Sequence, residues 1–103
     1  MVYEGEYKDG NRSGKGKEYN LINDKLIYEG EYMNGKRNGK GKEYYNDKLI
    51  YEGEYKDGKR NGKGKEYYNG NLIFEGEFIN GKKLFLKYNM WKIFFYLICV
   101  YFS

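Results

Sequence analysis

The sequence contains no histidine, proline, alanine, threonine or glutamine, and it has a single cysteine, Cys99. Without histidine, the chain lacks both the usual base that activates a nucleophile and a Cys/His ligand set for zinc. The lone cysteine excludes an internal disulfide. The two serines, Ser13 and Ser103, have no histidine to activate them. We therefore expect neither enzymatic activity nor a cofactor.

The charged residues are closely mixed, with 19 basic and 15 acidic side chains and a net charge of +4. Nucleic-acid binding usually requires a one-sided basic surface, so we expect no nucleic-acid partner and no small-molecule substrate. Residues 53–59 fit G-x-x-x-x-G-K, but Arg60 stands where a phosphate-binding loop has serine or threonine. No secretory signal precedes the first repeat, and a cytoplasmic location is the expectation.

The abundant residues, 14 tyrosines and 15 glycines, recur with a fixed period. Aligning the chain on itself gives units that start at Tyr3, Tyr28, Tyr51 and Phe74, in steps of 25, 23 and 23 residues. Such a period is typical of stacked repeat architectures. Within a unit, the apolar and aromatic segment 26–32, the Asn-Gly-rich turn 34–39 and the segment 39–45 predict a β-hairpin, and 46–48 turns into the next unit.

The charges suggest a register for each hairpin. Pairing the two strands of the second unit outward from the turn places Glu31 opposite Lys40 and Glu29 opposite Lys42. Opposite charges directly across a strand pair contribute roughly 0.2–1 kcal/mol each. Every repeat carries the same glutamate pair, so we interpret these residues as a solvated, charge-paired face. Catalytic carboxylates would instead occupy two different environments in a cleft.

Alternation along the strands places the aromatic residues on the opposite face. Tyr28, Gly30 and Tyr32 share this face with Gly39 and Gly41, where glycine leaves room for a ring over the backbone. A single hairpin is marginally stable, so each should depend on stacking against its neighbours. A single sheet cannot bury both faces, and we expect an exposed aromatic face and open edge strands that attract protein partners or further copies.

The repeated pattern Y-x-G-x-Y-x-x-G-x-x-x-G-x-G resembles the MORN repeat (membrane occupation and recognition nexus). The pattern matches three units completely and a fourth only in part. The first matches through Tyr3, Gly5, Tyr7, Gly10, Gly14 and Gly16. The second and third match through Tyr28, Gly30, Tyr32, Gly35, Gly39, Gly41, Tyr51, Gly53, Tyr55, Gly58, Gly62 and Gly64. The resemblance implies an all-β fold, an elongated single sheet of successive antiparallel hairpins of about 23 residues each. It also implies roles in scaffolding, dimerisation and the apposition of membranes or cytoskeleton.

The predicted organisation is a repeat array over residues 3–83, with an incomplete last unit, followed by a non-repeat tail over 84–103. The tail contains ten consecutive apolar residues, 93–102, about half of what a spanning helix needs. Three interpretations remain open: a frameshift or read-through product, a short membrane anchor, or a strand that covers the last hairpin.

Two functional hypotheses follow. The first is a non-catalytic scaffold that binds protein partners or self-associates, as a homodimer or a larger assembly. The alternative is a peripheral module that recognises anionic phospholipids, because basic residues near a membrane surface contribute about 1 kcal/mol each. In that hypothesis the turn residues lack partners within the chain, and the candidate lipid-binding residues are Lys36, Arg37, Lys40, Lys42, Lys59, Arg60, Lys63 and Lys65.

Overall fold

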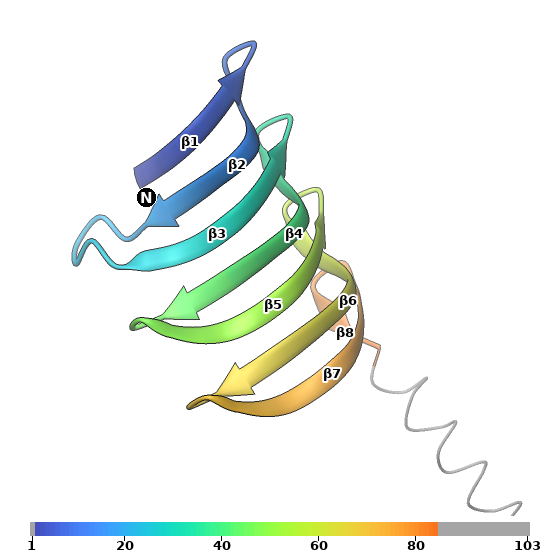
Figure 1. Ribbon diagram of the computed structural model, residues 1–103. Helices are drawn as coiled ribbons and strands as arrows, with labels where there is room; N and C mark the ends of the chain where they lie inside the picture. The colour runs from blue at the N-terminus through green and yellow to red at the C-terminus, as the bar shows by residue number, and fades with distance from the viewer. Residues whose placement is uncertain (1, 85–103) are drawn as a thin grey trace, which may run out of the picture.

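The protein forms one open antiparallel sheet in which the eight strands follow each other in sequence order (Figure 1). The computed structural model describes residues 2–84; the predicted tail, beyond Leu84, lies outside the described residues. The strands are β1 (Val2–Lys8), β2 (Asn11–Tyr19), β3 (Leu26–Met33), β4 (Lys36–Tyr45), β5 (Lys48–Lys56), β6 (Lys59–Tyr68), β7 (Asn71–Ile79) and β8 (Lys82–Lys83). The predicted all-β array of hairpins is confirmed.

Two-residue turns connect the strands within each hairpin. Asn34 and Gly35 join β3 to β4 with φ angles of 51° and 83°, the left-handed values that tight hairpin turns require. The predicted turn over 34–39 was therefore too long, because β4 already begins at Lys36. Each turn also contacts the preceding hairpin: the Gly35 N–H donates to the carbonyl of Arg12, near the start of β2, at 3.0 Å. Successive hairpins are thus tied together at their turns.

A bulge near each turn changes half of the predicted register. Glu29 lies opposite Lys42 as expected, but the register between β3 and β4 shifts after Gly30, so Glu31 does not face Lys40 within the hairpin. Gly39 permits the shift by adopting a φ of 91°. Glu31 instead accepts a hydrogen bond from the Lys40 backbone N–H at 2.6 Å. A carboxylate therefore satisfies a backbone donor in the bulge.

Glycine makes room for the rings at Gly30 and Gly41, as predicted, but not at Gly39. A Cβ at Gly30 would lie 2.5 Å from the Tyr28 hydroxyl oxygen and 2.6 Å from the Gly41 Cα. The Tyr28 ring thus lies flat along the backbone, and its hydroxyl donates to the Glu31 carbonyl at 3.1 Å. At Gly39 the close neighbour is the Glu31 carboxylate, so this glycine serves the bulge rather than a ring.

The rings form an unbroken edge-to-face zigzag from β1 to β7. Tyr28 contacts Tyr32 in its own hairpin and Tyr55 in the next one, with ring centroids 5.4 and 5.2 Å apart. Guanidinium groups cover the rings, with the Arg37 Cζ 4.2 Å from the centroid of Tyr28. The prediction of an exposed aromatic face was wrong, because Tyr28 is 0% exposed and Tyr32 4% exposed. A single layer buries its rings between glycine backbone, neighbouring rings and arginine.

Candidate functional site

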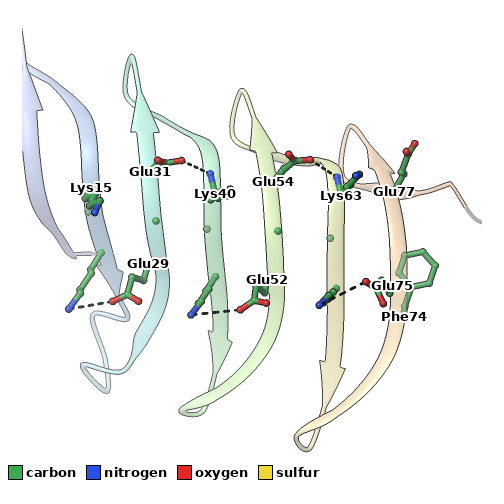
Figure 2. A pocket seen from close by; sticks show the side chains of 18 of the residues that line it. Lys15, Glu29, Glu31, Lys40, Glu52, Glu54, Lys63, Phe74, Glu75 and Glu77 are labelled. Carbon is green, nitrogen blue, oxygen red and sulfur yellow. Dashed lines mark hydrogen bonds and ion pairs between the residues drawn. The ribbon is translucent and has the colours of Figure 1, made fainter.

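The face opposite the rings carries a long hollow with a volume of about 1690 Å³, which we call the charged groove. Its lining includes glycine backbone and the glutamate and lysine side chains of strands β1 to β7. Figure 2 shows those of β2 to β7 side by side across the sheet. The sequence predicted this charge-paired face. It did not predict that the face is hollow.

One row of alternating charges extends along the groove. The register places Glu4, Lys17, Glu29, Lys42, Glu52, Lys65 and Glu75 in one continuous line over seven strands. Each lysine lies closest to the glutamate of the following strand: 3.5 Å from Lys17 to Glu29 and 3.7 Å from Lys42 to Glu52. These side chains are nearly half exposed, so each pair contributes at most about 1 kcal/mol. Their larger effect is to keep the groove close to neutral.

A second row lies on the turn side of the first. Here Lys40 is opposite Glu54, while the Lys63 N–H donates to the Glu54 carboxylate at 2.6 Å. The Lys40 side chain is exposed and forms no ion pair among residues 2–84. In total, seven glutamates and six lysines line the groove. The predicted lysines Lys40, Lys42, Lys63 and Lys65 therefore lie together, but among glutamates rather than on a basic surface.

A buried ionic network lies on the ring face, where Glu18 is 3% exposed. Arg37 donates two hydrogen bonds to this carboxylate, both at 3.0 Å, and the Tyr32 hydroxyl donates a third. Burial raises the pKa of Glu18, but the hydrogen bonds from Arg37 and Tyr32 outweigh it and hold the pKa below its usual value. Burial, together with the Glu18 carboxylate, raises the pKa of Tyr32. This network connects three strands.

The same network recurs one repeat further along the chain. Arg60 donates to both oxygens of Glu43, at 2.8 and 3.0 Å, and Tyr55 supplies the hydroxyl donor. Burial raises the pKa of Glu43, but Arg60 and Tyr55 reverse the effect and lower it. Arg60 also donates to Glu66 at 2.9 Å. Each arginine thus joins neighbouring hairpins.

The expectation that the turn residues lack partners was wrong for Arg37 and Arg60. Both arginines turn back over the rings and bind glutamates, so they offer no free charge at the surface. The sequence carries a signal for this network, because every complete unit has an arginine two residues after the turn and a glutamate near the end of the second strand. That signal is visible only when pairing between repeats is considered.

The lysines that flank the turns differ from these arginines. Lys36 and Lys59 are exposed and form no ion pair in the described part of the chain. They belong to a row at the turn end of the sheet, which we call the basic rim and which consists of Lys8, Lys36, Lys56, Lys59 and Lys82. Of the predicted lipid-binding residues, Lys36 and Lys59 therefore lie at the turns, whereas the other four lysines lie in the groove among glutamates.

Nothing in residues 2–84 groups three or more potential metal ligands, and no helix there is long and apolar enough to cross a bilayer. The hairpin turn after Tyr55 confirms that the glycine-lysine motif at 53–59 lies in a β-hairpin, away from any strand-to-helix loop.

Comparison with known proteins agrees with this geometry. The family model for the MORN repeat matches residues 3–20, 28–49, 51–72 and 74–83, four repeats in all. No curated protein matches the chain. The MORN repeat is a non-enzymatic module, generally found in proteins that mediate interactions or bind membranes. With four matching repeats arranged as one open antiparallel sheet, this chain belongs to the MORN-repeat family.

Proposed function

We propose that the chain is a non-catalytic interaction module that holds a protein partner along the charged groove. The continuous groove across seven strands is the observation that carries this proposal. Its floor is glycine backbone, which lets a partner approach the sheet closely, and its walls present donors and acceptors in alternation. Such a surface suits an extended segment with both signs of charge.

The burial of the rings also supports the groove as the binding surface. The aromatic face is covered by arginines that are already paired, so a partner there would have to displace ion pairs. In the groove the ion pairs are partly exposed and individually weak, and a partner can exchange them at small cost. Protein binding at the groove, in the cytoplasm, is the function we infer.

A library of random peptides displayed on phage tests this function. The double variant Lys40→Glu/Lys63→Glu reverses two exposed groove charges, and Lys36→Glu/Lys59→Glu reverses two rim charges as a matched control. We expect enriched peptides that lose binding to the groove variant and keep it to the rim variant. Failure to enrich peptides, or binding that ignores the groove variant, would contradict the proposal.

A second candidate function is peripheral binding to anionic phospholipid, and the basic rim favours it. Its five lysines lie near only two acidic turn residues, Asp9 and Asp57, so the rim carries a local excess of positive charge. Each lysine near an anionic membrane contributes about 1 kcal/mol, which makes a row of lysines sufficient for salt-dependent docking.

Flotation with liposomes separates this candidate from the first one. The full chain is mixed with liposomes that contain or lack anionic phospholipid, at physiological salt. If the rim binds membranes, Lys36→Glu/Lys59→Glu abolishes flotation with anionic liposomes, whereas Lys40→Glu/Lys63→Glu preserves it. Equal loss in both variants would point to net charge alone. If the folded protein does not float with anionic liposomes, the membrane-binding hypothesis is rejected.

Self-association is a further form of the interaction function. The outer edge of β1 is a free strand edge among the described residues, and free edges invite pairing. Sedimentation of the full chain at tens of micromolar tests it, and a strictly monomeric mass would exclude assembly at that concentration.

A further inference from the structure

Among the described residues, the lysines that line the charged groove are of two kinds. Those of the first row form ion pairs with a glutamate of the following strand: Lys17, Lys42 and Lys65. Those of the second row are exposed, and their ammonium groups form no ion pair or hydrogen bond within residues 2–84: Lys15, Lys40 and Lys63. The unpaired positive charges of the groove therefore stand in one line, on its turn side.

The glutamates of the second row do not neutralise these lysines, because the bulges engage their carboxylates. The Glu31 carboxylate accepts the backbone N–H of Lys40 at 2.6 Å and lies against the bulge residue Gly39. The same hydrogen bond recurs one repeat later, where Glu54 accepts the backbone N–H of Lys63 at 2.6 Å. The ammonium groups are thus left for a partner, and the partner must be acidic where it meets them.

The unpaired lysines recur on every second strand, which sets the spacing of the partner's acidic residues. Lys15 lies on β2, Lys40 on β4 and Lys63 on β6. Neighbouring strands of a sheet lie about 4.8 Å apart, so consecutive unpaired lysines are about 9.6 Å apart. A complementary segment along the groove therefore needs one acidic side chain on the same face about every 9.6 Å.

A polyproline II helix matches this spacing better than the other regular conformations. It rises about 3.1 Å per residue with three residues per turn, so every third residue returns to the same face after about 9.3 Å. Seven residues of an α-helix, two turns, span about 10.5 Å. Residues on one face of an extended strand are about 6.7 or 13.4 Å apart.

The width of the groove floor also favours a thin partner. The two rows of charged side chains are two residues apart on each strand, as at Lys40 and Lys42, so their Cα atoms are about 6.7 Å apart. Between the rows the floor is a line of glycines that includes Gly41 and Gly53. An α-helix with its side chains is about 10–12 Å wide and would rest on top of both rows. A polyproline II segment is a single extended chain, and its free carbonyl groups can accept hydrogen bonds from lysine and water.

We propose that the charged groove binds an acidic polyproline II segment of a partner protein, in which every third residue is Asp or Glu and faces Lys15, Lys40 or Lys63. The proposal names the partner of the interaction function given above and rests on it. Proline at the positions between the acidic residues fixes φ and holds the segment in this conformation before binding. Such a partner loses less conformational freedom when it binds than a flexible acidic chain does.

A labelled peptide, EPPEPPEPP, is the probe, and its fluorescence anisotropy is measured with the full chain at low ionic strength, where exposed charges are least screened. The control peptide EEEPPPPPP has the same composition and charge but places its acidic residues side by side. We expect saturable binding of EPPEPPEPP that is about tenfold tighter than that of EEEPPPPPP, because only the first peptide reaches all three lysines. Equal binding of the two peptides, or no binding of EPPEPPEPP, would overturn the proposal.

Two variants of the same strand test which lysines the peptide meets. Lys40→Gln removes an unpaired lysine and should weaken binding of EPPEPPEPP about fivefold. Lys42→Gln is the matched control, because it removes one positive charge from the same groove, but from a lysine that is already paired with Glu52. Its affinity should fall less. Lys40→Glu should reverse the preference and bind EPPKPPEPP more tightly than EPPEPPEPP. Equal losses in the two glutamine variants would show an effect of net charge alone and contradict the register.

The peptides selected on phage separate this proposal from the function on which it rests. Selected peptides with an acidic residue at every third position would support both. Peptides that depend on Lys40 and Lys63 but carry their acidic residues at α-helical spacing would overturn the polyproline II segment and leave the groove as the binding surface. If neither selected peptides nor EPPEPPEPP bind, both proposals fail.

Discussion

Phe78→Tyr should stabilise the protein, because it would supply a hydrogen bond that the last hairpin lacks. Phe78 corresponds to Tyr32 and Tyr55, whose hydroxyls donate to the buried carboxylates of Glu18 and Glu43. Phenylalanine has no hydroxyl, so the buried Oε1 of Glu66 lacks the hydroxyl donor that Glu18 and Glu43 have. Its partner is instead the Lys83 ammonium, 2.5 Å away.

The magnitude follows from the chemistry of the missing bond. A hydrogen bond to a charged group contributes roughly 1.5–3 kcal/mol, and holding a new hydroxyl in place removes part of this. We expect a net gain of about 1–2 kcal/mol in the free energy of unfolding. For a domain of this size, each kcal/mol raises the melting temperature by roughly 4–8 °C.

Urea titration followed by circular dichroism measures the gain. Tyr55→Phe is the reciprocal variant and should lose about 1–3 kcal/mol, because Glu43 would lose its hydroxyl donor. Tyr45→Phe is the control, since Tyr45 is 68% exposed and its hydroxyl has no hydrogen-bond partner among residues 2–84. If Phe78→Tyr fails to stabilise while Tyr55→Phe destabilises, the Lys83 ion pair already satisfies Glu66, and the reasoning is refuted.

Three further predictions concern acid, alkali and glycine. The pKa values of Glu18 and Glu43 are lowered in the folded state, so these residues contribute stability above about pH 4.5 that is lost as the pH falls through their folded pKa values. Urea unfolding from neutral to acid pH should show this loss, and Glu18→Gln should flatten the profile; an unchanged slope would contradict the assignment. Burial raises the pKa of Tyr51 to about 12, so its contribution is complete below about pH 10 and disappears as the pH rises through 12. Above pH 10, the tyrosinate absorbance of the buried rings should therefore rise together with the loss of the circular dichroism signal. If all tyrosines ionise before the protein unfolds, the rings are accessible to solvent and the prediction fails. Gly53→Ala places a Cβ 2.5 Å from the Lys63 carbonyl oxygen and should cost about 3 kcal/mol or more, whereas Gly58→Asn, in an open turn with φ of 85°, should cost under about 1 kcal/mol by urea titration.

Composition and period were enough to predict the hairpins and the two faces. The Glu29–Lys42 pair was predictable because it lies in the regular part of the hairpin. The Glu31–Lys40 pair was not, because the letter glycine does not reveal whether Gly39 makes room for a ring or permits a bulge. At Gly41 the ring interpretation was correct, and at Gly39 the φ of 91° shows the other role.

The covering of the aromatic face depends on contacts between repeats. Arg37 and Glu18 are 19 residues apart, and Arg60 and Glu43 are 17 apart, so neither pair lies within one hairpin. Sequence reasoning treated each hairpin as a unit and counted Arg37 as a free charge. Two of its eight candidate lipid-binding residues, Arg37 and Arg60, are therefore side chains that the sheet uses to connect its own repeats.

In the ring zigzag, the contact between two repeats is nearly the same as the contact within one repeat. The contact of Tyr28 with Tyr32 inside a hairpin and its contact with Tyr55 across the boundary have the same interplanar angle, 82°. Duplicating or deleting one whole unit therefore creates no junction that the chain does not already contain. The number of repeats can change during evolution by unequal recombination while every ring keeps its two neighbours. The number of repeats, and therefore the length of the groove, can then evolve to match the length of the partner segment that binds there.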